Sequence, residues 1–167
     1  YLYTYTQVVS LGLINDPERS DMDFIRGRTS EVTARDAALT IDGIPIIKPP
    51  WGRITAIDMN TGDYAWVVPT GNGDRIRNHP RLRDLDPPPL GGDNATNGPL
   101  LTKTLLIYCL TAGSSSGGPR LVAYDKATGE ELASVDLPSG AIGTPMTYMV
   151  DGRQYIALTI GGGPRLV

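Results

Sequence analysis

The hydrophobic pattern of this chain changes at short intervals and predicts strands separated by tight turns. Residues 1–9 predict a strand, because aromatic or aliphatic residues alternate with threonine within residues 1–6. Several short runs after residue 99 also predict strands, and the Asp151-Gly152 pair between the last two is typical of a two-residue hairpin. These later strands are expected at residues 100–103, 105–111, 120–125, 132–137, 143–150 and 153–159.

The most distinctive unit spans residues 54–66, which we interpret as two antiparallel strands joined by a tight turn. Its first arm is rich in β-branched residues, and residues 58–62 supply the Asp, Asn and Gly that tolerate the conformations of a short hairpin. The second arm ends on Trp66. Because an indole is a heavy apolar load for one hairpin, we predict that Trp66 is a buried anchor that packs into a neighbouring unit.

The hairpin is repeated along the chain. Residues 122–132 restore Ala, Asp, Thr and Gly at matching positions, with Ala133 at the place of Trp66. A second repeat is exact, because the six residues 117–122 recur letter for letter at 162–167. The offset between those two copies is 45 residues, which is the length of one four-stranded propeller blade.

The pattern Ala-x-Asp-x-x-Thr-Gly-x-x-x-Trp at residues 56–66 resembles the tryptophan-docking motif of the pyrroloquinoline-quinone (PQQ) dehydrogenases. That family folds as an eight-bladed β-propeller. The resemblance extends in family order over roughly residues 44–163 and implies an all-β fold of four-stranded antiparallel blades. Further family-like stretches are found at residues 48–53, 76–80, 101–106, and 143–148 followed by 151–155.

Length and composition indicate a partial propeller. A complete propeller of this type needs several hundred residues, so a chain of 167 residues corresponds to a fragment or a much reduced relative. Twenty Gly and fourteen Pro with one Phe favour short strands and tight turns over helices. The expected division is the end of a preceding blade at 1–9, an insertion loop at 10–43, the docking-motif segment at 44–69, a long loop at 70–98 and C-terminal blade segments at 99–167.

Charge excludes several classes of partner. Fifteen Lys plus Arg against eighteen Asp plus Glu leave a net charge of −3, and basic residues do not cluster with aromatic ones. The chain therefore lacks the signature of a nucleic-acid-binding or anionic-membrane-binding protein. No apolar run reaches transmembrane length.

The single cysteine and the single histidine are both expected to have structural roles. Cys109, the single cysteine, lies in an apolar run and is expected to be a small buried hydrophobe. The single histidine, His79, is a possible proton acceptor or metal ligand, but no second histidine or suitably spaced carboxylate accompanies it. We therefore favour a hydrogen-bonded loop residue at position 79.

The resemblance implies an oxidoreductase in which PQQ lies on the propeller axis over a calcium ion. A catalytic aspartate would accept the hydroxyl proton of the substrate while hydride moves to the quinone. In the family, this aspartate and the calcium ligands lie upstream of the matched part, so we predict no catalytic residue and no metal ligand here. We expect a periplasmic fragment of a PQQ-dependent dehydrogenase that oxidises a sugar or an alcohol and passes electrons to a quinone or cytochrome.

One cofactor-binding position is implied by the family. A tryptophan that forms the floor under the PQQ ring precedes a Gly-x-Leu-x-Thr strand, which matches residues 98–102, and Thr96 stands at the place of that tryptophan. The neighbouring Asn94 and Asn97 carry amides able to donate hydrogen bonds to quinone or carboxylate oxygens. Asn94, Thr96 and Asn97 are therefore the candidate cofactor-binding residues, and polar loop residues that cap a strand are the alternative interpretation.

Two other classes of function remain open at the level of sequence. The first is a non-catalytic propeller that uses the same repeat as a protein-binding scaffold. The second is a truncated gene product whose repeats form a partner-binding β surface. For the segment alone we expect neither tight PQQ binding nor turnover. Its expected partners are the remainder of the propeller or further copies of itself.

Overall fold

The computed structural model describes residues 1–7, 12–27, 40–93 and 98–161. The chain forms two compact units, one made of residues 1–7 and 49–167 and the other of residues 8–48. Nearly all regular structure in the described residues is β-strand, and the one α-helix among them, α2 (Asp74–Arg77), has four residues. The prediction of an all-β chain is confirmed.

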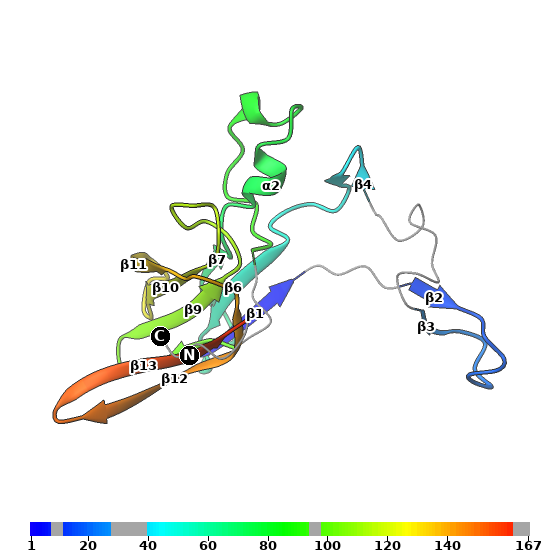
Figure 1. The fold of residues 1–167 in the computed structure, drawn as a ribbon. Helices are drawn as coiled ribbons and strands as arrows, with labels where there is room; N and C mark the ends of the chain where they lie inside the picture. The colour runs from blue at the N-terminus through cyan, green and yellow to red at the C-terminus, as the bar shows by residue number, and fades with distance from the viewer. Residues whose placement is uncertain (8–11, 28–39, 94–97, 162–167) are drawn as a thin grey trace. The chain divides into compact units, whose positions relative to one another are not determined.

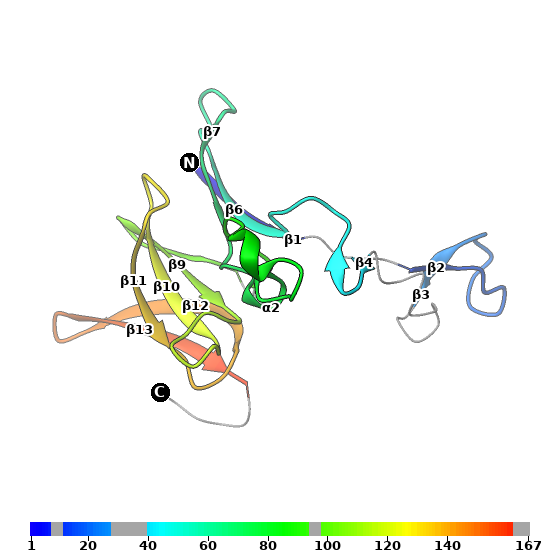
Figure 2. The same ribbon diagram turned by 90° about the horizontal axis from the view of Figure 1, so that it is seen from above.

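The first unit contains three antiparallel sheets (Figures 1 and 2). Their strand orders are β1-β6-β7, β11-β10-β9-β8 and β12-β13. The predicted strands after residue 99 are all present, with boundaries that differ by at most two residues. The strands are β1 (Leu2–Gln7), β6 (Gly52–Ile57), β7 (Tyr64–Pro69), β8 (Leu100–Leu101), β9 (Leu105–Leu110), β10 (Arg120–Asp125), β11 (Glu131–Asp136), β12 (Ala141–Val150) and β13 (Arg153–Ile160).

The two repeated hairpins have the same turn. In β6–β7 the Asp58 amide donates to the Asp63 carbonyl at 2.9 Å, and the Gly62 amide donates to the Asp58 carbonyl at 2.7 Å. In β10–β11 the Asp125 amide donates to the Glu130 carbonyl, and the Gly129 amide to the Asp125 carbonyl, both at 2.8 Å. Gly62 and Gly129 have φ values of 81° and 77°, which favour glycine. The repeat seen in the sequence is therefore a repeat of structure.

The four-stranded sheet packs on both of its faces. On one face, Tyr108 and Val122 form a core with Ile54 of β6. On the opposite face, Cys109 packs in a second cluster with Ala141 of β12. Side chains of β9 therefore point alternately into the two cores, as the period of a strand requires. The expectation that Cys109 is a buried hydrophobe is confirmed.

Three sheets in succession, with a four-stranded antiparallel sheet between two others, form a partial β-propeller. The hairpin β12–β13 turns at Asp151 and Gly152, whose φ values of 48° and 75° match the predicted two-residue turn.

The second unit contains short hairpins. Strand β2 (Gly12–Ile14) pairs with β3 (Ile25–Gly27), and β4 (Thr40–Ile41) pairs with β5 (Ile44–Pro45). The β2–β3 pair lies within residues 10–43, the predicted insertion loop, where no strand was predicted. Few apolar residues alternate there, and the pairing joins residues 11 to 15 positions apart that no local pattern marks.

Candidate functional site

The predicted long loop at residues 70–98 is closed at its base. Backbone bonds tie its two ends together, from the Leu90 amide to the Asn72 carbonyl at 2.9 Å and from the Asp93 amide to the Thr70 carbonyl at 3.0 Å. The body of the loop contains α2 and the 3-10 helix η1 (Arg83–Leu85). The described part of the loop is therefore an ordered excursion from β7 with its ends side by side.

Glycines make the closure possible. Gly71 has φ 81°, and a Cβ atom there would overlap the Asp93 carboxylate. Gly91 has φ 67°, and its Cβ would overlap the Gly52 carbonyl oxygen. Both positions combine a left-handed backbone with a lack of space, so only glycine fits them.

Asp93 anchors the downstream end of the loop. Its Oδ2 accepts a hydrogen bond from the Gly73 amide at 3.0 Å, and its carbonyl accepts one from the Thr111 amide at 2.9 Å. Burial raises the pKa of the Asp93 carboxyl, while the Gly73 N–H and the Arg120 charge act in the opposite direction. The residue directly before the candidate cofactor segment is thus fixed to two separate parts of the chain.

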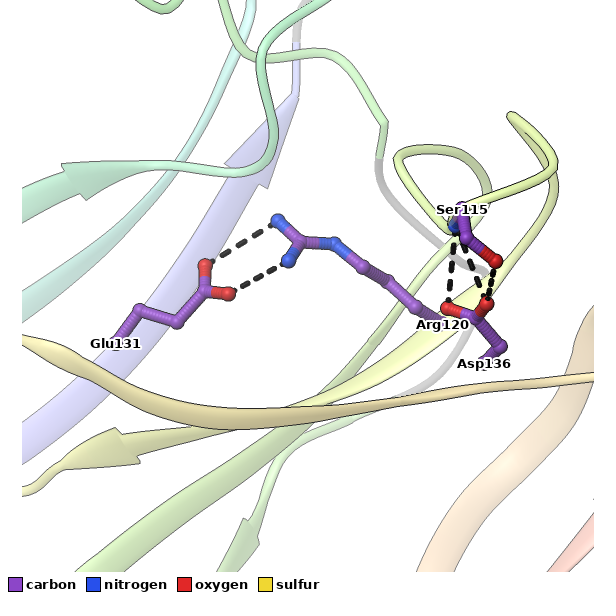
Figure 3. A network of polar contacts seen from close by, with 4 residues as sticks. All are labelled: Ser115, Arg120, Glu131 and Asp136. Atoms are coloured by element: carbon purple, nitrogen blue, oxygen red, sulfur yellow. Dashed lines mark hydrogen bonds and ion pairs between the residues drawn. The ribbon is translucent and has the colours of Figure 1, made fainter.

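Polar contacts among Ser115, Arg120, Glu131 and Asp136 lie on β10, β11 and the loop before β10 (Figure 3). Arg120, at the start of β10, makes a two-pronged ion pair with Glu131 of β11, with distances of 2.6 and 3.2 Å. Ser115 donates from both its amide and its hydroxyl to the Asp136 carboxylate. The Nε of Arg120 is buried and has no hydrogen-bond partner among the described residues. The positive charge of Arg120 lowers the pKa of the Asp93 carboxyl, against the larger effect of burial.

Thr144 contacts the first described residue after the candidate segment. The Gly98 amide donates to the Thr144 Oγ1 at 3.1 Å across 46 residues of sequence. Thr144 lies in an irregularity of β12, where the register with β13 shifts between Ile142 and Met146. Asn94, Thr96 and Asn97 themselves lie outside the described residues, so their role stays a prediction.

His79 takes part in local loop structure. Its Nδ1 accepts a hydrogen bond from the Arg81 amide at 3.3 Å, and its carbonyl accepts one from the Leu82 amide at 2.8 Å. Within residues 1–7, 12–27, 40–93 and 98–161, no group of three His, Cys, Asp or Glu side chains is placed to hold a metal ion. The interpretation of His79 as a hydrogen-bonded loop residue is supported.

Comparison with known proteins identifies the family. The profile described as "PQQ: Glucose/ethanol/alcohol dehydrogenase, beta-propeller domain" matches residues 14–156. The chain belongs to this PQQ propeller family.

Several curated relatives of the propeller are dehydrogenases. The chain is 36% identical over 135 residues to a quinate/shikimate dehydrogenase (quinone) of Acinetobacter baylyi, covering 72% of this chain and 14% of the relative. It is 33% identical over 124 residues to a quinoprotein glucose dehydrogenase of Escherichia coli, with the same coverage of 72% and 14%. A quinohemoprotein alcohol dehydrogenase of Comamonas testosteroni is 29% identical over 162 residues, covering 97% of this chain and 19% of that protein. The chain thus spans less than a fifth of the length of these relatives.

Within this PQQ propeller chain, Trp66 connects successive sheets. Its Nε1 donates to the Lys126 carbonyl at 3.2 Å, in the turn between β10 and β11. A Cβ on Gly129 would come within 2.8 Å of the indole, so the ring lies directly on that turn. The expectation that Trp66 packs into a neighbouring unit is confirmed, although the side chain is only partly buried.

Two contacts that matter in this propeller were not predicted from the sequence. Tyr3 donates its hydroxyl to the same Lys126 carbonyl at 2.9 Å, and its ring lies 5.7 Å from that of Trp66. Thr144 reaches Gly98 from another sheet. Both contacts join residues far apart in sequence. The Gly-Thr-Pro triplet at 143–145 was a visible signal for the second contact, since glycine and proline interrupt a predicted strand there.

Proposed function

We propose that this chain is part of a PQQ-dependent dehydrogenase that oxidises CH–OH groups of a sugar or an alcohol. The observation that carries the proposal is the family match over residues 14–156. The relatives have names that describe oxidation of quinate, glucose or alcohol, all of which are hydroxyl compounds. Because the chain spans so little of those relatives, the activity is proposed for a longer protein that contains it.

The proposed cofactor contacts are Asn94, Thr96 and Asn97. Amide and hydroxyl groups suit PQQ, since its quinone and carboxylate oxygens accept hydrogen bonds. The described surroundings fit this use, because Asp93 and Gly98 on either side of the segment are each held by hydrogen bonds. When bound, PQQ supplies the two-electron oxidation, and the residues of this chain orient it.

Other features of the proposal rest on the family alone. A calcium ion under the cofactor, a catalytic aspartate elsewhere in the propeller, a quinone or cytochrome acceptor and a periplasmic location are expected. No helix among the residues described here has the length and apolar character needed to cross a bilayer.

The non-catalytic scaffold is less well supported. A propeller that only binds proteins needs the docking repeat and nothing more, whereas the additional family stretches here are tied to the candidate site. The Trp51 amide, in the stretch at 48–53, donates to the Leu90 carbonyl at 2.9 Å in the base of the loop. Thr144, in the stretch at 143–148, holds Gly98.

Dye reduction by the complete gene product tests the proposal. The purified apoprotein would be supplied with PQQ and Ca²⁺ and assayed with glucose, ethanol and quinate and an artificial electron acceptor. We expect PQQ-dependent reduction with at least one of these substrate classes. Absence of reduction across a broad panel of sugars, alcohols and cyclic polyols, by a protein that is folded, would favour the scaffold.

A further inference from the structure

We propose that Asn72-Gly73 is a latent site of spontaneous deamidation, which the hydrogen bond from Gly73 to Asp93 in the closed loop base holds in an unreactive state. The inference is independent of the proposed function. Asparagine followed by glycine is a reactive pair in unfolded chains, because glycine has no side chain to hinder the approach of its nitrogen to the asparagine side chain. Asn72 is exposed to solvent in the folded chain.

The reaction is an intramolecular attack that releases ammonia. The backbone nitrogen of Gly73 loses its proton and bonds to Cγ of Asn72, and the side-chain nitrogen of Asn72 leaves as ammonia. Water then opens the cyclic succinimide at either of its carbonyl groups. One opening gives aspartate, and the other gives isoaspartate, in which the main chain runs through Cβ and is longer by one atom.

The nucleophile of this reaction is the group that the fold restrains. The Gly73 N–H donates to Asp93 Oδ2 at 3.0 Å, and the negative charge of that carboxylate disfavours loss of the proton. The Gly73 carbonyl accepts a hydrogen bond from the Ile76 amide at 2.9 Å. Gly73 is buried, and a Cβ there would come within 2.8 Å of the Gly91 carbonyl oxygen. The nitrogen cannot swing toward the preceding side chain while these contacts hold.

The residues before Gly73 are fixed as well. The Asn72 carbonyl accepts from the Leu90 amide at 2.9 Å, and the Gly71 carbonyl accepts from the Gly91 amide at 3.1 Å. Deamidation therefore requires local opening of the loop base, and its rate in the folded protein is the rate in the unfolded chain multiplied by the open fraction. Opening breaks several hydrogen bonds of ordinary strength, so the open fraction should be below about one in ten.

Deamidation would in turn weaken the loop base. Isoaspartate at position 72 lengthens the main chain between two residues whose hydrogen bonds close the loop. It also converts the former Asn72 carbonyl into a free carboxylate, one residue from the N–H that binds the Asp93 carboxylate. Like charges in this position repel each other. The Leu90 and Gly91 amides should therefore exchange their hydrogens faster in the modified protein.

Peptide mapping by mass spectrometry of the complete gene product tests the inference. The protein is incubated at mildly alkaline pH, either folded or in urea, and the conversion of Asn72 is followed with time. We expect Asn72 to convert at least about tenfold more slowly in the folded protein than in the denatured one.

Two variants of Asp93 test the contact itself. Asp93→Ala removes the acceptor of the Gly73 N–H, and Asp93→Asn keeps a side-chain oxygen able to accept it. Both retain the backbone hydrogen bonds of residue 93 to Thr70 and Thr111. We expect Asn72 to convert about tenfold faster in folded Asp93→Ala than in the parent, which is the factor for one lost hydrogen bond of ordinary strength. Conversion in Asp93→Asn should stay closer to the parent.

Asp151-Gly152 is the internal control for the variants. This pair lies in the exposed turn of another sheet, and nothing lies within 4 Å of the Cβ position of Gly152. It forms a succinimide by loss of water, so the same peptide map reports it. Its rate of isomerisation should be the same in the parent and in both variants.

Equal conversion of Asn72 in the folded and the denatured parent would overturn the inference, and this comparison requires no variant. Faster conversion in the folded parent would also overturn it, because Asp93 would then act as a base that takes the Gly73 proton. Conversion in folded Asp93→Ala that matches the parent would show that the Asp93 carboxylate does not restrain Gly73, which is the third contradicting result.

Discussion

At the scale of single residues, the Lys126 carbonyl is the point where two neighbouring sheets are joined. Trp66 and Tyr3 both donate to it, from β7 and β1. The indole also lies over Gly129, so polar and apolar contacts meet on one turn. A backbone carbonyl remains available whatever side chain occurs at position 126.

Replacement of Trp66 by alanine should lower the free energy of unfolding by about 3 kcal/mol, the lower end of the range for a buried tryptophan, because the side chain is only partly buried. Urea denaturation measures the change. Tyr64→Ala on the same strand is the control, since Tyr64 is 62% exposed, and it should cost less than about 0.5 kcal/mol. Equal effects of the two substitutions would show that the indole does not anchor the sheets.

The stability of the β10–β11 turn should depend on pH through the Asp125 carboxylate. The amides of Thr128 and Ala127 donate to its carboxylate and lower the pKa of the Asp125 carboxyl. A lowered pKa means that this stabilisation is present above the ordinary value near 3.8 and is lost as the pH falls through the folded-state pKa. NMR titration should show the Ala127 and Thr128 amide signals moving together in that acidic range. Amide signals unaffected down to the acid-unfolding limit would contradict the assignment.

At the scale of elements, the sequence predicts strands well where turn chemistry is local. The Asp151-Gly152 turn and the boundaries of β10 follow from residues that neighbour one another. The closed base of the loop at 70–98 could not be predicted in this way. Its hydrogen bonds join residues 70–73 to residues 90–93, and no periodicity in the sequence marks such a pairing. The contact of Thr144 with Gly98 joins residues 46 positions apart. The Gly-Thr-Pro triplet at 143–145 marks an irregular backbone at Thr144 but does not indicate its partner. The candidate cofactor residues came only from family resemblance.

Gly62 and Gly129 occupy the same position in the two repeated turns. Substituting each of them by alanine distinguishes the cost of backbone strain from the cost of disturbing the packing between sheets. Gly62→Ala should cost about 1 kcal/mol for its positive φ alone, since nothing lies within 4 Å of its Cβ position. Gly129→Ala has the same strain and must also displace the Trp66 ring, so we expect about 1–3 kcal/mol more. Chemical denaturation of both variants tests this. Equal costs would mean that the indole does not rest on the second turn.

At the scale of the whole molecule, large apolar side chains near the turn of the β12–β13 hairpin are exposed. Within the described residues β13 pairs only with β12, and the rings of Tyr148 and Tyr155 stack at 5.4 Å on the exposed hairpin. Met149 is 63% exposed. In a propeller, a further sheet covers such a face.

The isolated chain should therefore self-associate. Exposed strand edges and apolar faces promote pairing with other chains. Light scattering over a concentration series measures the mass, and Met149→Lys should shift the distribution toward the monomer because it places a charge on the exposed hairpin. A chain that stays monomeric at high concentration would contradict the prediction.

Titration of the complete apoprotein with PQQ in the presence of Ca²⁺ tests the proposal that this chain is part of a PQQ enzyme. Absorbance of the bound cofactor reports occupancy. We predict saturable binding with one PQQ per propeller, weakened by Asn94→Ala or Asn97→Ala, while residues 1–167 alone bind PQQ weakly or not at all. A folded complete protein that shows no saturable binding of PQQ would contradict the proposed function.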